Sequence, residues 1–360
     1  MIKRIGILTG GGDCPGLNAV IRGLVKVGIG KYGWEMVGIL DGFEGLLENR
    51  TIPLPLSAIK GILPRGGTLL GTTNRCDPFE VPVALPDGRV ERRNYSANAI
   101  LNFQRLALDG LVATGGDGTL AIAHRLFGLG IPVVGIPKTI DNDLDATEIT
   151  FGFMTAVETV TEAVDKLHTT AESHHRVMIV EVMGRDAGWI ALYAGLAGGA
   201  DVILIPEIAF HLQRVLDKIR AREEAGSNFS IIVIAEGTCL GEERTYVDRD
   251  TLTGVQRLGG VGEKLADAIR SKVDLEVRTT VLGHVQRGGG PIAFDRILAT
   301  RMAVEAAELI AAGKWDRMVA YRNGDIVSVP ILEAIGRRKV VDPNSQIIVQ
   351  ARALGVEFGD

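Results

Sequence analysis

Short β-rich apolar runs alternate with longer helical patterns along the whole chain. The short runs predict strands, because a strand buried on both faces reads as a continuous apolar segment. We expect strands near 4–9, 36–40, 110–114, 132–136, 177–182, 202–205, 230–235, 277–282 and 317–321. We expect helices near 16–30, 119–128, 153–170, 187–198, 211–225, 260–272 and 293–312.

This alternation is typical of βα units that build a parallel sheet with helices on both faces. The expected strands outnumber those of an ordinary sheet, which has about five or six, so we predict two α/β domains. The segment from Pro78 to Asn94 contains three prolines and an Asp-Gly pair. It predicts a loop or a β-hairpin.

The composition and net charge of the chain argue against several classes of function. The 360 residues include 39 Lys plus Arg and 44 Asp plus Glu, a formal charge of −5, so we expect no nucleic-acid partner. Cys14, Cys76 and Cys239 have no zinc-type spacing and suit a reducing compartment. The apolar runs stop well short of the ~18 residues of a membrane helix, and no signal-peptide core is visible. We therefore expect a cytoplasmic protein without a membrane partner.

A glycine loop, Thr9–Gly16, follows the first expected strand and opens a helix, where free N–H groups favour phosphate. Read as G-x-G-x-x-G from Gly10, it has Pro15 at the third glycine, which argues against a dinucleotide fingerprint. Read as a Walker loop, it continues with Leu17-Asn18 instead of the Lys-Ser/Thr pair. A tight turn without a ligand remains an alternative for this loop taken alone.

A second glycine loop, Gly115–Thr119, follows the strand at 110–114. Its glycines let the backbone approach a polyphosphate, and Asp117 can hold Mg²⁺ against phosphate oxygens. The same string occurs in lipid and NAD kinases, so it indicates nucleotide phosphates better than it indicates a substrate. The alternative is a structural turn in which Asp117 caps the helix.

Three polar groups, Lys138, Asp141 and Asp143, follow the next strand within six residues. Two carboxylates beside a lysine are costly without a purpose, because like charges repel and each needs a partner. One can accept a hydroxyl proton while the other organises metal or water. An Asx-turn would explain one aspartate only.

Two further strand ends carry arginines, in Met183-Gly184-Arg185 and in His284-Val285-Gln286-Arg287. Arginine suits the planar, bidentate capture of a phosphate ester. A single arginine of this kind is more often solvated or salt-bridged, but its recurrence beside acidic, glycine-rich loops favours a ligand.

These strings together resemble 6-phosphofructokinase in order and approximate spacing, over essentially the whole chain. The subgroup that they resemble contains ATP-dependent and pyrophosphate-dependent members. The strings are TGGGDCPGLNAVIRG at 9–23, PRGGTLLGT at 64–72, GGDGT at 115–119, PKTIDND at 137–143, VEVMGRDAGW at 180–189, PE at 206–207 and LGHVQRGG at 282–289.

The resemblance implies transfer of a phosphoryl group to the 1-hydroxyl of fructose 6-phosphate, with Asp141 as general base and Asp117 on Mg²⁺. The implied ligands of the donor phosphates are Gly12, Arg75, Cys76, Gly116, Asp117, Gly118 and Thr119. The implied ligands of the sugar phosphate are Thr139, Ile140, Asp141, Met183, Gly184, Arg185, Glu236, His284, Val285, Gln286 and Arg287.

The resemblance also implies that Arg176 and Arg278 reach the 6-phosphate of a neighbouring subunit, so a homodimer or homotetramer is expected. The implied fold is phosphofructokinase-like, with two doubly wound α/β domains and largely parallel sheets. Residues 1–150 plus 287–335 would form the donor domain, and residues 151–286 plus 336–360 the sugar-phosphate domain.

Two positions bear on the donor. In pyrophosphate-dependent relatives an aspartate replaces Gly118, and its carboxylate takes the space of the ATP α-phosphate. Lys138 is the contrary signal, because the pyrophosphate users carry lysine there. A flexible lysine can accompany ATP, whereas a carboxylate against the α-phosphate is hard to accommodate. We therefore expect ATP, with pyrophosphate as the alternative.

Two other classes of protein are weaker alternatives. An NAD-dependent oxidoreductase would use the first glycine loop with Asp41 as a ribose ligand. A noncatalytic phosphosugar sensor would keep the arginines and tolerate loss of the base, so the presence of Asp117, Asp141 and Asp143 argues against it.

Overall fold

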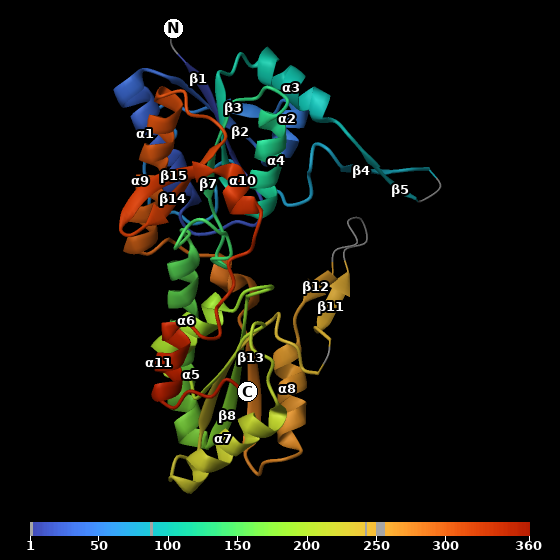
Figure 1. Cartoon of the computed structure of the whole chain (residues 1–360), viewed down its shortest axis with the longest axis vertical. Helices are drawn as coiled ribbons and strands as arrows, with labels where there is room; N and C mark the ends of the chain where they lie inside the picture. The colour runs from blue at the N-terminus through green and yellow to red at the C-terminus, as the bar shows by residue number, and fades with distance from the viewer. Residues whose placement is uncertain (1–2, 87–88, 242, 250–255) are drawn as a thin grey trace. The chain divides into compact units, whose positions relative to one another are not determined.

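The computed structural model describes residues 3–86, 89–241, 243–249 and 256–360 (Figure 1). The chain divides into two compact units, which are described separately. Unit 1 comprises Met1–Ile140, Leu144–Met154 and Arg287–Arg338, and unit 2 comprises Asp141–Asp143, Thr155–Gln286 and Lys339–Asp360. We expected crossings near 150, 286 and 336, and we expected Asp141–Asp143 in the first domain. The division assigns these three residues to unit 2, where Lys339 bonds to the backbone of Asp143 and to the side chain of Asn142.

Unit 1 is built on a sheet whose described strands are β1 (Arg4–Thr9), β2 (Glu35–Ile39), β3 (Thr51–Pro53), β6 (Gly110–Gly115), β7 (Val133–Pro137), β14 (Arg317–Arg322) and β15 (Asp325–Pro330). Their order is β15-β14-β7-β6-β1-β2-β3. The inner strands run parallel, with Ile5 of β1 opposite Gly110 of β6, whereas β3 and β15 pair antiparallel at the edges.

Helices cover both faces of this sheet. They are α1 (Leu17–Tyr32), α2 (Phe43–Glu48), α3 (Ser96–Arg105), α4 (Asp117–Phe127), α9 (Ala293–Ala311) and α10 (Ile331–Ile335). Helices α1 and α9 pack together on one face, and α2, α3, α4 and α10 lie on the other (Figure 1). A hairpin of β4 (Val81–Ala84) and β5 (Val90–Arg93) projects from unit 1, as the sequence allowed for this segment.

Unit 2 contains a parallel sheet in the order β13-β8-β10-β9. Its strands are β8 (Arg176–Val182), β9 (Val202–Leu204), β10 (Ser230–Ala235) and β13 (Glu276–Val281), and β13 leads into the 3₁₀ helix η1 (Gly283–Arg287). The helices are α5 (Phe153–His174), α6 (Trp189–Ala197), α7 (Leu212–Glu224), α8 (Val261–Arg270) and α11 (Gln346–Ala353). A small hairpin pairs β11 (Tyr246–Arg249) with β12 (Gln256–Leu258).

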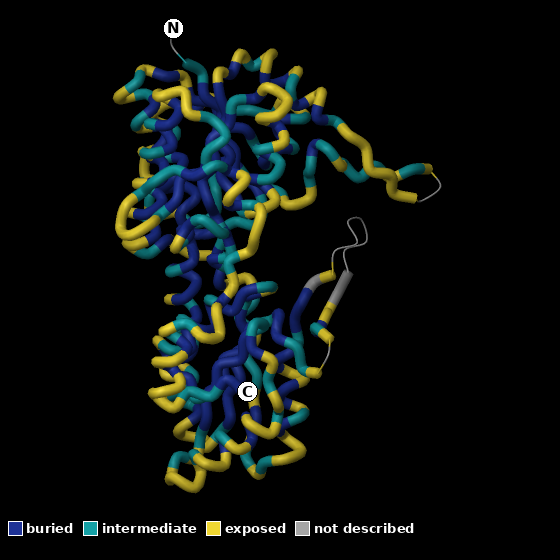
Figure 2. Tube along the Cα trace, in the orientation of Figure 1, coloured by how far each residue is buried: buried dark blue, intermediate teal, exposed yellow. Residues whose placement is uncertain are grey.

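Each unit has its own apolar core, which Figure 2 shows as the buried trace along the strands. In unit 1, Leu8, Val37 and Leu111 of the sheet pack against Phe43 of α2 and Leu120 of α4. In unit 2 the equivalent layer joins the sheet to α7 and α8. The central strands β1, β6, β7 and β10 carry near-continuous apolar runs because both of their faces are covered.

The strand order of each sheet reverses at one position, which is where open α/β sheets bind ligands. In unit 1 the chain runs from β1 to β2 on one side and later to β6 on the other side. In unit 2 the strands β9 and β10 lie on one side of β8, and β13 lies on the other. The carboxyl ends at these two switch points carry the loops that begin at Gly10, Gly116, Met183 and Leu282.

The predicted α/β fold is confirmed, and every expected strand and helix is present to within a few residues. The sequence pattern missed the short elements β3, α2, α10 and α11, the hairpin of β11 and β12, the antiparallel edge strand β15 and the helix α3. Most of these elements are short or half-exposed, so their apolar pattern is weak; α3 instead buries one face at helical spacing and was missed despite that pattern. None of the helices in the described part of the chain combines the length and apolar character of a bilayer-spanning segment.

Candidate active site

The first glycine loop of unit 1 packs tightly against the second. A Cβ added at Gly10 would lie 2.6 Å from the Oγ1 of Thr119, and one at Gly115 would lie 2.3 Å from its Cβ. Gly11 has a φ of +77°, a left-handed conformation that favours glycine. Its N–H donates to Thr73 O at 3.0 Å. The glycines therefore bring two helix-opening loops together, with backbone groups close to any ligand.

Two cations lie against the first loop. Lys138, only 3% exposed, donates from Nζ to the carbonyl oxygen of Gly12. Arg287 donates from its guanidinium to Asp13 O at 3.2 Å, and a Cβ at Gly12 would lie 2.8 Å from that guanidinium. The loop thus combines helix-start N–H groups with two fixed positive charges, which is the chemistry that holds a polyphosphate.

The second loop places Asp117 and Gly118 in the first turn of α4, and both are exposed. A carboxylate oxygen at this position is a ligand that Mg²⁺ takes together with phosphate oxygens, so the residues present fit the ion. A Cβ added at Gly118 would have no described atom within 4 Å. The space next to Gly118 is therefore open in this unit.

Arg75 and Cys76 lie on a segment next to the first loop. The N–H of Arg75 donates to Thr73 Oγ1 at 3.1 Å, and its side chain is exposed. Cys76 instead packs partly buried against the apolar core. Burial raises the pKa of the Cys76 thiol to about 12, and the nearby carboxylates of Glu44, Asp77 and Glu48 add to this shift. The Cys76 thiol is therefore uncharged at neutral pH.

The aspartates that follow β7 lie in unit 2 on the irregular segment Asp141–Asp143, which begins in a bend of the backbone and is called the turn. Asn142 is 3% exposed and has a φ of +52°, and Lys339 donates from Nζ to its Oδ1 at 2.9 Å. Before the turn, Thr139 O accepts a hydrogen bond from Thr150 Oγ1 at 2.7 Å, and Ile140 is fully buried. The side chain of Ile140 therefore belongs to the buried core.

The switch point of unit 2 brings together loops that are distant in sequence. The N–H of Gly237 donates to Gly184 O at 3.1 Å, which joins the loop of Arg185 to the loop of Glu236. Gln286 is fully buried and accepts from the N–H of Met183 at 3.2 Å. Its side chain thus links two loops.

The remaining residues of the predicted sugar set around η1 are open to solvent: the side chains of His284 and Val285 are exposed. Arg287, which belongs to the same predicted set, lies in unit 1 against Gly12, on the side of the chain crossing at 286 that the expected domain bounds gave it.

Arg176 begins β8 at the other end of the sheet of unit 2, and Arg278 lies within β13, opposite Met178 of β8. Glu276 accepts from Arg176 at 2.5 Å and also from Arg278. The pKa of the Glu276 carboxyl is lowered, chiefly by the hydrogen bond from Arg176. Arg176 begins β8 and Met183 follows its end, so at about 3.3 Å per residue they are roughly 20 Å apart. Arg176 therefore lies well away from the loop of Met183 within one chain.

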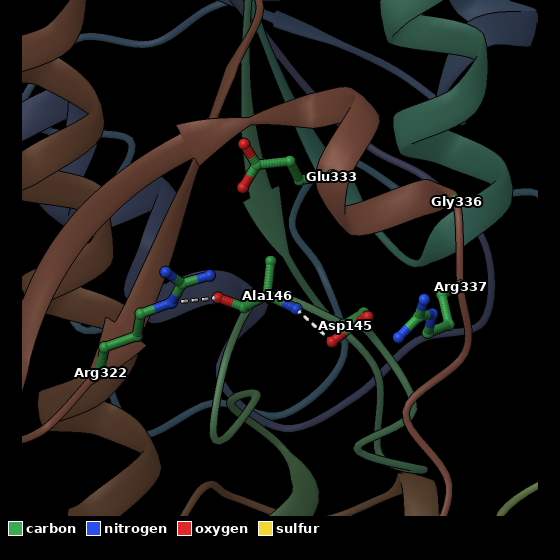
Figure 3. A pocket seen from close by; sticks show the side chains of 6 residues that line it. All are labelled: Asp145, Ala146, Arg322, Glu333, Gly336 and Arg337. Atoms are coloured by element: carbon green, nitrogen blue, oxygen red, sulfur yellow. Dashed lines mark hydrogen bonds between the residues drawn. The ribbon is translucent and has the colours of Figure 1, made fainter.

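A cavity of about 410 Å³ lies elsewhere in unit 1 (Figure 3). Arg322 of β14 donates to Ala146 O at 2.9 Å, and Asp145 accepts from the N–H of Ala146 at 2.8 Å. Glu333 and Arg337 also line the cavity, so the lining contains two carboxylates and two guanidinium groups. It has neither a glycine loop nor an uncompensated cation, so it does not suit a polyphosphate. The lining residues are Asp145, Ala146, Arg322, Glu333, Gly336 and Arg337.

Unit 1 combines two glycine loops, cations at their edge and an open position at Gly118. This combination suits a protein that transfers phosphoryl groups. The sequence pattern of the family described as "Phosphofructokinase" matches residues 4–310, which is well over half of the chain. The chain belongs to the phosphofructokinase family.

The relatives of this phosphofructokinase include proteins named for ATP and a protein named for pyrophosphate. It is 46% identical to "ATP-dependent 6-phosphofructokinase 2" of Clostridium perfringens, over 100% of this chain and 99% of that protein. It is 51% identical to "Pyrophosphate--fructose 6-phosphate 1-phosphotransferase" of Streptomyces coelicolor, over 94% of this chain and 96% of that protein. The structure of phosphofructokinase from Saccharomyces cerevisiae is 31% identical, with a TM-score of 0.77, over 93% of this chain and 45% of the yeast chain.

Several residues that organise these loops were missed by the sequence reasoning. Asn18 accepts from the N–H of Leu69 at 2.7 Å and donates to Gly66 O, so it holds the 64–72 segment. Glu181 accepts from the N–H groups of Gly260 and Gly262 at 2.9 and 2.8 Å, at the start of α8. Asn18 and Glu181 lie inside the strings that resemble the family, so the resemblance could have pointed to them. Lys339 lies outside all of these strings.

Proposed function

We propose that this phosphofructokinase is ATP-dependent and transfers the terminal phosphoryl group of ATP to the 1-hydroxyl of fructose 6-phosphate. The product is fructose 1,6-bisphosphate, and the reaction belongs to glycolysis. The observation that carries the proposal is the full-length match to relatives named ATP-dependent 6-phosphofructokinase, at 46% and 50% identity. Gly118 supports ATP, because the position is open and carries no carboxylate.

In this proposal unit 1 binds the donor. The N–H groups at Gly12 and Gly116–Thr119 bind phosphate oxygens at two helix starts, and Arg75 adds charge from an exposed position. Lys138 neutralises charge on the transferring phosphoryl group. Asp117 would hold Mg²⁺ together with phosphate oxygens. When bound, the ion supplies positive charge that stabilises negative charge on the donor.

Unit 2 in this proposal binds the sugar. Asp141 accepts the proton of the 1-hydroxyl as that oxygen attacks phosphorus, and the bond from phosphorus to the bridging oxygen of the donor breaks. Glu236 and the loop of Met183, Gly184 and Arg185 orient the sugar hydroxyls. Phosphoryl transfer needs little covalent chemistry from the protein, so positioning and charge neutralisation supply most of the rate.

The 6-phosphate is assigned to Arg176 and Arg278 of a second copy of the chain. The roughly 20 Å from Arg176 to the loop of Met183 supports this for Arg176, because one hexose phosphate does not span that distance. The active enzyme is therefore a homodimer or homotetramer, and it works in the cytoplasm.

Pyrophosphate is the second candidate donor, and two observations favour it. The Streptomyces coelicolor relative at 51% identity is named for pyrophosphate. Lys138 stands against the first glycine loop, where it can meet a short donor. Open space at Gly118 outweighs these observations, because a long donor needs that space and a short donor does not.

The direct test is turnover of fructose 6-phosphate and Mg²⁺ by the full-length protein, with ATP and pyrophosphate in parallel reactions. We expect fructose 1,6-bisphosphate with ATP at a kcat/KM well above that with pyrophosphate. Turnover with pyrophosphate alone would assign the donor choice to Lys138. No turnover with either donor would contradict the proposed function.

A further inference from the structure

Lys339 holds the turn that carries the proposed base. Its N–H donates to Asp143 O at 2.9 Å, and its Nζ donates to Asn142 Oδ1 at 2.9 Å. One residue thus contacts the turn through both its backbone and its side chain. All of these residues belong to unit 2.

Lys339 is itself held from its other side. Trp189, the first residue of α6, donates from Nε1 to Lys339 O at 3.1 Å, and the Lys339 ammonium lies 5.7 Å from the centre of the Trp189 indole ring. Two residues further on, the N–H of Val341 donates to Glu207 at 2.9 Å, and Glu207 also accepts from the N–H of Gly188 at 2.9 Å. The segment 339–341 is therefore fixed against the start of α6.

The backbone at Asn142 takes a conformation that is uncommon outside glycine. Asn142 has a φ of +52°, in the left-handed region, which asparagine adopts more readily than most other residues. A residue persists there when its surroundings determine its conformation. The bond from Lys339 to Asn142 Oδ1 provides this, because it fixes the side chain of a residue that is 3% exposed. The direction in which Asp141 leaves the turn depends on that conformation.

We propose that Lys339 is a positioning residue for Asp141 and acts through Asn142. This role rests on the proposed function, because it requires that Asp141 is the general base. Lys339 itself contacts neither substrate nor metal in this proposal. It sets the angle at which the carboxylate meets the 1-hydroxyl, a quantity to which proton transfer is sensitive.

The test is a double-mutant cycle with Lys339→Met and Asn142→Gly. Methionine keeps the length of the side chain and the backbone bond to Asp143 but removes the bond to Asn142. Glycine at position 142 adopts the left-handed conformation freely and removes the acceptor. We expect each single variant to lower kcat about 10- to 100-fold, because a displacement of about 1 Å can cost 10²-fold. The KM for ATP should change less than about twofold, since the donor ligands lie in unit 1.

The pair should be coupled, so Lys339→Met should lower kcat less than about twofold in the Asn142→Gly background. Lys339→Arg keeps a donor of similar reach and should restore kcat to within about fivefold of wild type. Lys218→Met is the matched control, because Lys218 also donates to a carbonyl in unit 2, that of Gly355 at 2.6 Å, and lies outside the proposed site. This control should keep the wild-type kcat.

The outcomes separate the two proposals. Wild-type turnover with an unchanged kcat for Lys339→Met, or additive losses in the cycle, would overturn the positioning role alone. Absent wild-type turnover would refute the proposed function and this role with it. If Lys339→Met does not fold, Asn142→Gly and Lys339→Arg still test the contact: Asn142→Gly at the wild-type kcat would overturn the role.

Discussion

Replacing Gly118 by aspartate tests the choice of donor at one position. Gly118 is exposed in the first turn of α4, and a Cβ there would have no described atom within 4 Å. The fold accommodates the new side chain without a clash. A carboxylate at a helix start gains about 0.3–1 kcal/mol from the helix dipole, and leaving glycine gains a few tenths more. We therefore expect an unchanged or slightly raised melting temperature.

The Gly118→Asp substitution should impair the use of ATP as donor. The resemblance to pyrophosphate-dependent relatives implies that this carboxylate takes the space of the α-phosphate. Two like charges about 4 Å apart repel by about 4 kcal/mol at an effective dielectric constant of 20, and by about 1 kcal/mol in water. A partly desolvated site lies between these limits, at about 2.5 kcal/mol. Since each 1.36 kcal/mol is tenfold, kcat/KM for ATP should fall about 70-fold. Pyrophosphate lacks the α-phosphate, so its kcat/KM should change less than about threefold.

The assay is initial-rate kinetics with each donor at saturating fructose 6-phosphate, together with thermal unfolding. Gly30→Asp is the matched control, because Gly30 is an exposed helical glycine in α1, also with no described atom within 4 Å of its Cβ position. It adds the same charge outside the proposed site and should leave both donors unaffected. A folded Gly118→Asp enzyme that loses less than about tenfold with ATP, or loses equally with both donors, would refute the reasoning.

Three further results are expected. Asp141→Asn should keep its KM for fructose 6-phosphate while kcat falls about 10²- to 10⁴-fold, because an amide cannot accept the proton; a normal kcat would remove Asp141 from the mechanism. Mixing inactive Asp141→Asn subunits with inactive Arg176→Ala subunits under reversible dissociation should restore some activity, since a hybrid contains one site with both groups intact; hybrids without activity would place Arg176 in the site of its own chain. Alkylation of Cys76, followed by mass spectrometry, should rise about tenfold per pH unit from pH 7 to 9, because a thiol of pKa about 12 stays protonated throughout this range; a rise of only about threefold between pH 8 and 9 would show an ordinary thiol of pKa about 8.5.

Local pattern was enough to predict most of the fold. The inner strands are short apolar runs because both of their faces are buried, and that burial leaves a mark in consecutive residues. The glycine loops could be placed for the same reason, since the carboxyl end of a parallel strand is known once the strand is known. The edge strand β15 and the short helix α2 leave no such mark, because half-exposed or brief segments have weak periodicity.

The sequence by itself determined which residues follow each strand, and hence the chemistry available to this protein: glycine N–H groups, Lys138, and the aspartates at 117 and 141. Tertiary structure decided which of them meet. Arg287 stands three residues after His284, yet it lies against Gly12, 275 positions earlier in the chain, because the chain changes unit after Gln286. Lys339 reaches Asn142, 197 positions away, with no motif to announce it. Such contacts depend on the packing of whole strands and helices against each other, and that packing is not written in any short stretch of residues.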